Sequence, residues 1–337
     1  MGRPYALLRA GFPFVKTIGM RRWNNWPIDV ALGKEGRIYV LCRSETLAEI
    51  AKLTWDDQNL ATLSQKGTED GNFIWPVSLI IDGEENLYVS DEGLNRITVL
   101  DSDGNFLSKW GEKGDRDGQF NRPSGLAFDA DENIYLSDTL NHRIQKFTKD
   151  GKFLLKFGTF GDGDGHLNMP WGVTVDELGD VYVADWRNDR IQKFSAEGEF
   201  KMTIGKSGSE DGRFNRPTGV TVDKDGDIYV ADCGNNRVQL FSPEGRYVEK
   251  FIGDATLSKP ARDYLLTNAL PLRLREMANL EPQKRLRSPK SVVVDDEGRL
   301  YIADYNSFRV QVYQKEAIHL QPGQILPPLR SPQLLTV

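Results

Sequence analysis

Hydrophobic and polar residues follow one pattern that returns six times along this chain of 337 residues. Each unit opens with a proline and an apolar, alternating run; the prolines are Pro27, Pro76, Pro123, Pro170, Pro217 and Pro289. The first four intervals are 49, 47, 47 and 47 residues, and the last is 72. A nearly constant period with one longer interval predicts six structural units and a single insertion.

The pattern within one unit predicts four short β-strands and no helix. In the fourth unit, strands are expected at residues 173–176, 181–184, 190–194 and 200–204. The second of these is rich in β-branched and aromatic residues, which favour strands. Four strands per repeat of this length are typical of a propeller blade. We therefore expect an all-β, six-bladed β-propeller with four-stranded blades.

A signature at the end of the fourth strand predicts how the ring closes. It reads Phe106-x-x-x-Trp110-Gly111 in one unit and returns at residues 153–158 and 200–205. The sixth unit has no such strand after Tyr313, whereas the signature appears at residues 14–19. We expect residues 14–18 to form the outer strand of the sixth blade, which covers edges that would otherwise be open.

Short motifs recur from unit to unit and point to a family. They are Pro-x-Gly-Val-x-Val-Asp, Tyr-Val-Ala-Asp, Asn-x-Arg-Ile-Gln-x-Phe and Gly-x-Phe-Asn-x-Pro. Over residues 14–314 the chain resembles the NHL repeat, and the resemblance implies a six-bladed NHL propeller. We expect one propeller domain at residues 1–314, with a helical insertion at 254–288 and a proline-rich tail at 315–337. The resemblance alone fixes no function, because such folds host enzymes, partner-binding modules and RNA readers.

An aspartate and an arginine recur as a pair around the loop between the second and third strands. One interpretation makes them a ring of charges for a ligand; the favoured interpretation is that they bond across each turn and fix the loop. The first unit has Cys42 at the aspartate position and no matching arginine. The pairs are Asp91 and Arg96, Asp138 and Arg143, Asp185 and Arg190, Asp232 and Arg237, and Asp304 and Arg309.

Aromatic and arginine side chains are expected to gather on one face of the ring. The loops between strands two and three share this face with the loops that lead into each new blade. Such a mixture suits a binding surface, although the tryptophans could instead pack between blades. With the insertion, the candidate partner-binding residues are Trp171, Trp186, Tyr305, Phe308, Arg122, Arg216, Arg273 and Arg275.

Metal chemistry rests on few candidate residues. Peptide-amidating lyases look similar in fold and use a zinc held by three histidines, and His142 lies at a plausible equivalent position. Other units have Asn95, Asp189 and Asn236 there, so the resemblance does not carry a zinc site over. His142 and His166 could still meet on neighbouring loops. We predict no cofactor, with zinc or calcium as the alternative. Calcium-dependent lactonase propellers place a carboxylate and amides around the axis, and by that resemblance Asp29, where three other units have glycine, is the candidate carboxylate.

The insertion differs from the rest of the chain in its charge. Ser258 is a candidate helix N-cap with Pro260 in the first turn, and a second helix is expected from Pro271. Residues 254–290 carry eight Lys or Arg and four Asp or Glu, whereas the whole chain has a net charge of −6. A basic helical segment on an acidic ring could cover the axial channel as a lid, or project and grip a partner.

Composition limits the remaining possibilities. The acidic balance disfavours a nucleic-acid binder, which needs a basic surface. No apolar run is long enough to span a membrane, the N-terminal residues do not resemble a secretory signal, and two cysteines make no disulfide framework, so a cytoplasmic protein is expected. We expect a non-catalytic module that binds another protein. The alternatives are a small-molecule ligand, a metal-assisted lyase or hydrolase at the channel mouth, and an RNA-binding propeller.

Overall fold

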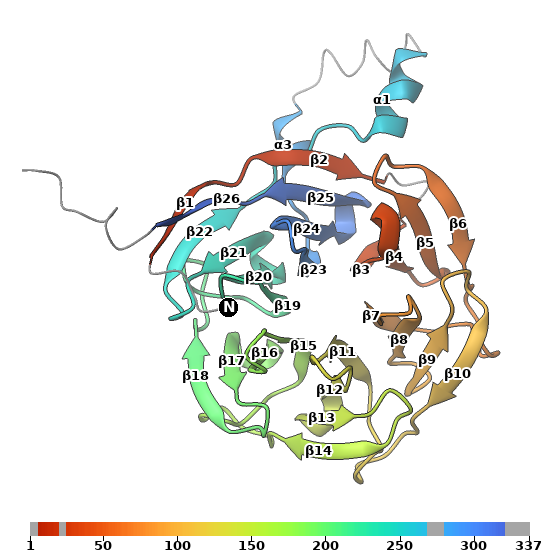
Figure 1. Ribbon diagram of the computed structural model, residues 1–337, viewed down its shortest axis with the longest axis vertical. Helices are drawn as coiled ribbons and strands as arrows, with labels where there is room; N and C mark the ends of the chain where they lie inside the picture. Colours follow the sequence, from red (N-terminus) through yellow and green to blue (C-terminus); the bar gives the residue numbers. More distant parts are fainter. Residues whose placement is uncertain (1–5, 20–24, 268–279, 321–337) are drawn as a thin grey trace, which may run out of the picture.

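The protein forms a closed ring of six four-stranded sheets (Figure 1), as expected from the repeat. The computed structural model describes residues 6–19, 25–267 and 280–320. The first three blades follow one another along the chain. They comprise β3 (Pro27–Leu32), β4 (Arg37–Arg43), β5 (Ala48–Thr54) and β6 (Asn59–Leu63); β7 (Pro76–Ile81), β8 (Leu87–Asp91), β9 (Arg96–Leu100) and β10 (Phe106–Trp110); and β11 (Pro123–Phe128), β12 (Ile134–Asp138), β13 (Arg143–Phe147) and β14 (Phe153–Phe157).

The last three blades continue the ring and close it. They comprise β15 (Pro170–Val175), β16 (Val181–Asp185), β17 (Arg190–Phe194) and β18 (Phe200–Ile204); β19 (Pro217–Val222), β20 (Ile228–Asp232), β21 (Arg237–Phe241) and β22 (Tyr247–Phe251); and β23 (Pro289–Val294), β24 (Arg299–Asp304), β25 (Arg309–Gln314) and β2 (Phe14–Ile18). β2 pairs antiparallel with β25, with Ile18 opposite Val310. The expected closure by residues 14–18 is confirmed.

The core consists of six apolar layers, one between each pair of neighbouring blades. Every blade contributes side chains to the layers on both of its faces. A tyrosine on the second strand illustrates the repeat, since Tyr39, Tyr135, Tyr182 and Tyr229 are all fully buried. A single blade would leave both of these faces in water, so its stability depends on its two neighbours.

A second ribbon lies outside the ring. β1 (Ala6–Gly11) pairs antiparallel with β26 (Glu316–Leu320), which brings the two ends of the described chain together beside blade five (Figure 1). The sequence places residues 316–320 in the tail, and here they form a strand. Lys315 connects this ribbon to blade five through ion pairs with Asp223, Asp225 and Asp227.

The insertion contains two described helices, α1 (Lys259–Leu266) and α3 (Glu281–Lys284). Ser258 caps α1 as expected, with its hydroxyl accepting a hydrogen bond from the Ala261 amide at 3.4 Å. Figure 1 shows both helices outside β2, at the edge of the ring and away from its centre. The second helix expected from Pro271 falls outside the described residues, as do Arg273 and Arg275.

Other short elements lie in the loops. One 3-10 turn, η1 (Lys34–Gly36), connects β3 to β4 in blade one. The others follow the second strands of blades three to six: η2 (Thr139–Asn141), η3 (Trp186–Asn188), η4 (Cys233–Asn235) and η5 (Tyr305–Ser307). Among the described residues, no helix is long and apolar enough to cross a membrane.

Candidate ligand site at the mouth of the axial channel

Strand register places two sets of loops on one face of the ring. In blade four the first residue of the inner strand, Pro170, lies opposite the last residue of the second strand, Asp185. The same pairing joins Pro123 to Asp138 and Pro217 to Asp232. The loops that lead into each blade and the loops between strands two and three therefore share a face, called the loop face below.

The recurring aspartates and arginines form bonds within the loops. Arg143 Nε lies 2.7 Å from Asp138 Oδ2, and the arginine also donates to the carbonyl oxygens of Arg116 and Gln119. Asp138 accepts from the Asn121 amide at 2.7 Å. Burial raises the pKa of the Asp138 carboxyl. The hydrogen bonds of this carboxylate and this guanidinium therefore stabilise the loop between the blades. Equivalent pairs join Arg190 to Asp185, Arg237 to Asp232 and Arg309 to Asp304.

Blades one and two depart from this arrangement. Arg96 donates to Thr98 and to carbonyl oxygens of the preceding loop, while Asp91 accepts from backbone amides that include Ile74 and Gly93. In blade one, Cys42 is fully buried in the layer between blades six and one. Burial raises the pKa of its thiol, so Cys42 is held as a neutral core residue.

A cavity of about 710 Å³ occupies the axis of the ring. It reaches from Arg43, Trp171 and Lys290 at the loop face to Asp295 and Asp296 toward the opposite face. The third residue of each inner strand faces it, and this position differs between blades. The six residues are Asp29, Ser78, Gly125, Gly172, Gly219 and Ser291. A volume of this size lies in the range of small-molecule sites.

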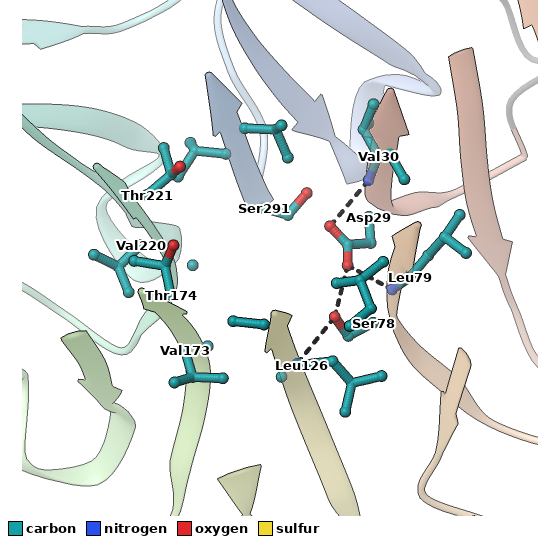
Figure 2. Close-up of a pocket in the computed structure, with 18 of the residues that line it drawn as sticks. Asp29, Val30, Ser78, Leu79, Leu126, Val173, Thr174, Val220, Thr221 and Ser291 are labelled. Carbon is teal, nitrogen blue, oxygen red and sulfur yellow. Dashed lines mark hydrogen bonds between the residues drawn. The ribbon is translucent and has the colours of Figure 1, made fainter. Parts of the chain in front are cut away.

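Asp29 joins the inner strands of blades one and two (Figure 2). Its Oδ2 accepts from the Ser78 hydroxyl at 2.9 Å and from the Leu79 amide at 2.8 Å, and its Oδ1 accepts from the Val30 amide. Ser78 Oγ in turn accepts from the Leu126 amide of blade three. Burial raises the pKa of Asp29 to about 6, although these donors favour the ionised form. The carboxyl can therefore change charge near neutral pH.

Glycine is required on the other side of the channel because inner strands approach one another closely there. A Cβ added to Gly125 would lie 2.5 Å from the Trp171 carbonyl oxygen, and one added to Gly172 would lie 2.6 Å from the Thr218 carbonyl oxygen. Backbone atoms cannot yield as side chains do, so a larger residue would separate the blades. At the third position of the inner strand, the channel wall is therefore polar on blades six, one and two and is formed by backbone alone on blades three to five.

Two cationic side chains, Arg43 of blade one and Lys290 of blade six, line the cavity at the channel mouth. Arg43 is 8% exposed, stacks over the Trp75 ring at 4.4 Å and donates from Nη1 to the Pro76 carbonyl oxygen. Lys290 Nζ lies 5.4 Å from the centre of the Tyr305 ring. Tyr305 packs against the apolar layer between blades one and two. Arg43, Lys290 and Tyr305 are called the cationic edge below.

Aromatic side chains gather on blade four, across the channel from blade one (Figure 1). The rings of Trp171 and Trp186 lie 5.9 Å apart, and Trp171 lines the cavity. The guanidinium groups of Arg187 and Arg216 lie 4.8 and 5.2 Å from the Trp186 ring. Trp171 and Trp186 are called the aromatic edge below. The structure thus brings together three of the candidate partner-binding residues, Trp171, Trp186 and Arg216.

The other candidates lie elsewhere on the same face. Phe308 contacts Trp26, with ring centres 5.0 Å apart. Arg122 is exposed, and its backbone amide donates to Asn95 at 2.8 Å. Cys233 is half-buried, with its sulfur 3.4 Å from Lys290 Nζ.

The two candidate metal-binding histidines make separate contacts. His142 Nδ1 accepts from the Met169 amide at 3.1 Å, and burial lowers the pKa of the imidazole. Asn95 and Asp189 accept from the equivalent amides in neighbouring blades, so His142 forms the same loop contact as its counterparts. His166 is exposed and lies near the Asp164 carbonyl oxygen. Within the described ranges, no group of three or more His, Cys, Asp or Glu side chains is arranged to hold a metal ion.

Sequence reasoning missed Arg43 and Lys290. A signal for both was present in the repeat. Arg43 aligns with Thr139, Trp186 and Cys233, and Lys290 aligns with small or apolar residues such as Ile28 and Val77. Blade two has Glu92 at the position of Arg43, and the other blades form without a cation at either position, so neither cation is needed for a blade to fold.

Comparison with known proteins supports the fold. The NHL repeat model matches residues 120–147, 167–194, 214–241 and 286–313. Comparison with curated proteins gave no match. Among solved structures, a streptogramin B lyase is 12% identical with a TM-score of 0.55, and the match covers 90% of this chain and 98% of that one.

Two further solved structures are similar in the same way. A catalytically inactive virginiamycin B lyase from Staphylococcus aureus with quinupristin is 11% identical with a TM-score of 0.55, and the match covers 94% of this chain and 87% of that one. A protein of unknown function from Bacteroides thetaiotaomicron is 17% identical with a TM-score of 0.61, covering 91% of this chain and 72% of that one. At these identities the likeness shows the fold alone.

Proposed function

Because this chain is an NHL-repeat six-bladed propeller, a fold that commonly mediates protein interactions, we propose that it is a binding module that holds an acidic segment of another protein on its loop face. The ring supplies a rigid platform, and the loops that differ between blades supply recognition. The observation that carries the proposal is the group of Trp186, Arg187 and Arg216, in which two guanidinium groups flank one half-buried indole.

The charges of this group support an acidic partner. Arg187 and Arg216 are exposed, and neither forms an ion pair with another residue in the described part of the chain. Lysines toward the opposite face are paired instead, as Lys146 is with Asp129 and Lys193 is with Asp180. Tryptophan and arginine are the residues that most often dominate binding energy at interfaces. Unpaired arginines beside a tryptophan are complementary to carboxylates that a partner would bring.

Charge reversal at the arginines tests this proposal. The doubly substituted Arg187→Glu, Arg216→Glu protein and the wild type are measured against an array of synthetic peptides of graded net charge. We expect the wild type to prefer acidic peptides and the variant to bind them at least about tenfold more weakly.

The matched control is Arg246→Glu, an exposed arginine in the turn between β21 and β22 on the opposite face. This control should bind the acidic peptides as the wild type does. Equal losses in both proteins, or a wild type that prefers single-stranded RNA to every peptide, would overturn the proposal.

A lyase or hydrolase acting at the channel mouth is the second candidate. The observation that favours it is Asp29, a carboxyl with a pKa of about 6 that lines the cavity and could exchange a proton near neutral pH. The described helices of the insertion lie away from the channel, so they give no support to a lid. Elemental analysis that found one bound metal ion per purified chain would favour this candidate over the binding module.

A further inference from the structure

Arg43 is a buried cation that no carboxylate of the described chain pairs with. It is 8% exposed and lines the axial cavity, and its Nε has no hydrogen-bond partner among the residues that the structure describes. Its one side-chain hydrogen bond to a described residue runs from Nη1 to the Pro76 carbonyl oxygen. A buried guanidinium without an anion is costly, because little of its lost hydration is replaced. An anion from outside the chain would supply the opposite charge and the hydrogen-bond acceptor for Nε.

Lys290 adds a second cation to the same cavity. It comes from β23 in blade six, next to β3 in blade one, and its ammonium group lies over the Tyr305 ring and near the Cys233 sulfur. Among the described residues Lys290 has no ion-pair partner. Two cations from neighbouring blades therefore line one side of the channel mouth, with the phenol of Tyr305 beside them.

The opposite side of the mouth is flat and apolar. Trp171 lines the cavity from blade four, and Trp186 packs beside it. Beyond the mouth the wall becomes unfavourable for an anion, since Asp29 lies deeper in the channel and Asp295 and Asp296 lie toward its far end. The mouth thus offers a cationic edge, an aromatic edge and an acidic channel behind them.

We propose that the channel mouth binds a small organic anion with a flat apolar body, such as an aryl carboxylate. The carboxylate lies against Arg43 and Lys290, and the aromatic body lies against Trp171. The cavity of about 710 Å³ is ample for a ligand of this size. Arginine suits the task because its planar fork can donate two parallel hydrogen bonds to one carboxylate.

Glu92 is the acidic residue to weigh against this proposal. It is buried at the position in blade two that Arg43 occupies in blade one, and the two side chains interact electrostatically without forming an ion pair. If Glu92 competes with the ligand for Arg43, its neutral replacement should strengthen ligand binding. If Arg43 serves only to hold Trp75 against the Pro76 backbone, substitution of any of these residues should leave ligand affinity unchanged.

Matched probes separate charge from shape. The probes are 2-naphthoate, its neutral analogue 2-naphthamide, and acetate, titrated while the indole N–H signals are followed by NMR. We expect 2-naphthoate to bind with a Kd of roughly 1 mM, as a fragment of this size does in a suitable pocket. The neutral amide should bind at least about tenfold more weakly, and acetate should not bind measurably at the same concentrations.

Substitutions identify the residues. Arg43→Met should weaken naphthoate binding at least about tenfold, Lys290→Met severalfold, and Glu92→Gln should strengthen it. Arg246→Met is the control, because this exposed arginine lies in the turn between β21 and β22, on the opposite face and outside the cavity lining. If Arg43→Met fails to fold, Lys290→Met and Arg43→Lys still decide, since both keep the site largely intact.

Three results would overturn the proposal. These are equal affinity for naphthoate and naphthamide, the same loss with Arg246→Met as with Lys290→Met, and no binding of naphthoate up to its solubility limit. Binding of acidic peptides through Arg187 and Arg216 is a separate matter, because neither arginine lines the cavity. Each proposal can therefore fail while the other stands.

Discussion

Asp29 shows how one residue changes the way two blades are joined. Blades three to five have glycine at this position, and their inner strands meet backbone to backbone. Asp29 instead reaches from β3 to the Ser78 hydroxyl and the Leu79 amide of β7. The joint is made by hydrogen bonds to a carboxylate that is almost fully buried. Burial favours the neutral acid, and so this joint carries a dependence on pH.

The contribution of Asp29 to stability should decrease as the pH rises. The pKa of Asp29 is about 6 in the folded protein against an ordinary value of 3.8, so from pH 4 to pH 6 the folded state binds more protons. Stability from this residue is highest below pH 4 and falls as the pH rises to 6. The free energy of unfolding of the wild type minus that of Asp29→Asn should fall by on the order of 3 kcal/mol across this window.

Urea unfolding at pH 4 to 7 measures this difference, and Asp29→Asn serves as the reference that cannot titrate at this position. Other carboxyls with raised pKa values, such as Asp57, contribute to both proteins and cancel. A difference that rises with pH would show that the hydrogen bonds to the carboxylate outweigh its burial.

At the scale of the element, strands within the repeat were predictable from sequence, and strands outside it were not. In blade four the third and fourth strands have the expected bounds, and the first begins at Pro170 rather than Val173 because that proline also pairs with Asp185. β2 could be found because it copies the blade signature. β1 and β26 carry no repeat, and each finds its partner some 300 residues away.

The closing strand gives the prediction at this scale. Ile18 of β2 is fully buried in the apolar layer between blades six and one, while Val15 on the same strand is 43% exposed. Ile18→Ala should lower the free energy of unfolding by about 2–5 kcal/mol, because it leaves a cavity in a layer that both blades share. Val15→Ala should change it by about 0.5 kcal/mol. Chemical unfolding followed by circular dichroism measures both, and similar small effects would mean that β2 does not close the ring.

At the scale of the whole molecule, the sequence predicted which loops share a face and that the ring has an axial channel, but not which side chains line the cavity. The repeat shows the order of strands in a blade, and that order predicts that Trp171, Trp186 and Arg216 lie on the same face of the ring. The cavity depends on which side chains six blades bring to one axis, and that requires the register of every blade at once. Arg43 could be aligned with the other blades, but it lies in the blade whose repeat pattern is weakest, and its place in the cavity wall did not follow from that alignment.

The two ends of the described chain lead to a prediction about the entire ring. The side chain of Lys315 is 5% exposed, and its Nζ lies 2.6, 2.7 and 2.9 Å from carboxylate oxygens of Asp223, Asp225 and Asp227 in blade five. Arg9 pairs with Asp227 from the other strand of the ribbon, and His319 lies 2.7 Å from Asp225. Removing the lysine charge would leave buried carboxylates without enough compensation.

Lys315→Met should therefore lower the free energy of unfolding by about 3–5 kcal/mol. Lys224→Met is the control, because this exposed lysine forms no ion pair with a described residue and donates to the Asp296 carbonyl oxygen at 2.8 Å. Every blade shares its apolar layers with two neighbours, so we expect the loss to lower the temperature of one cooperative transition in calorimetry. A separate early transition, followed by a main transition at the wild-type temperature, would show instead that the ribbon of β1 and β26 melts independently of the ring.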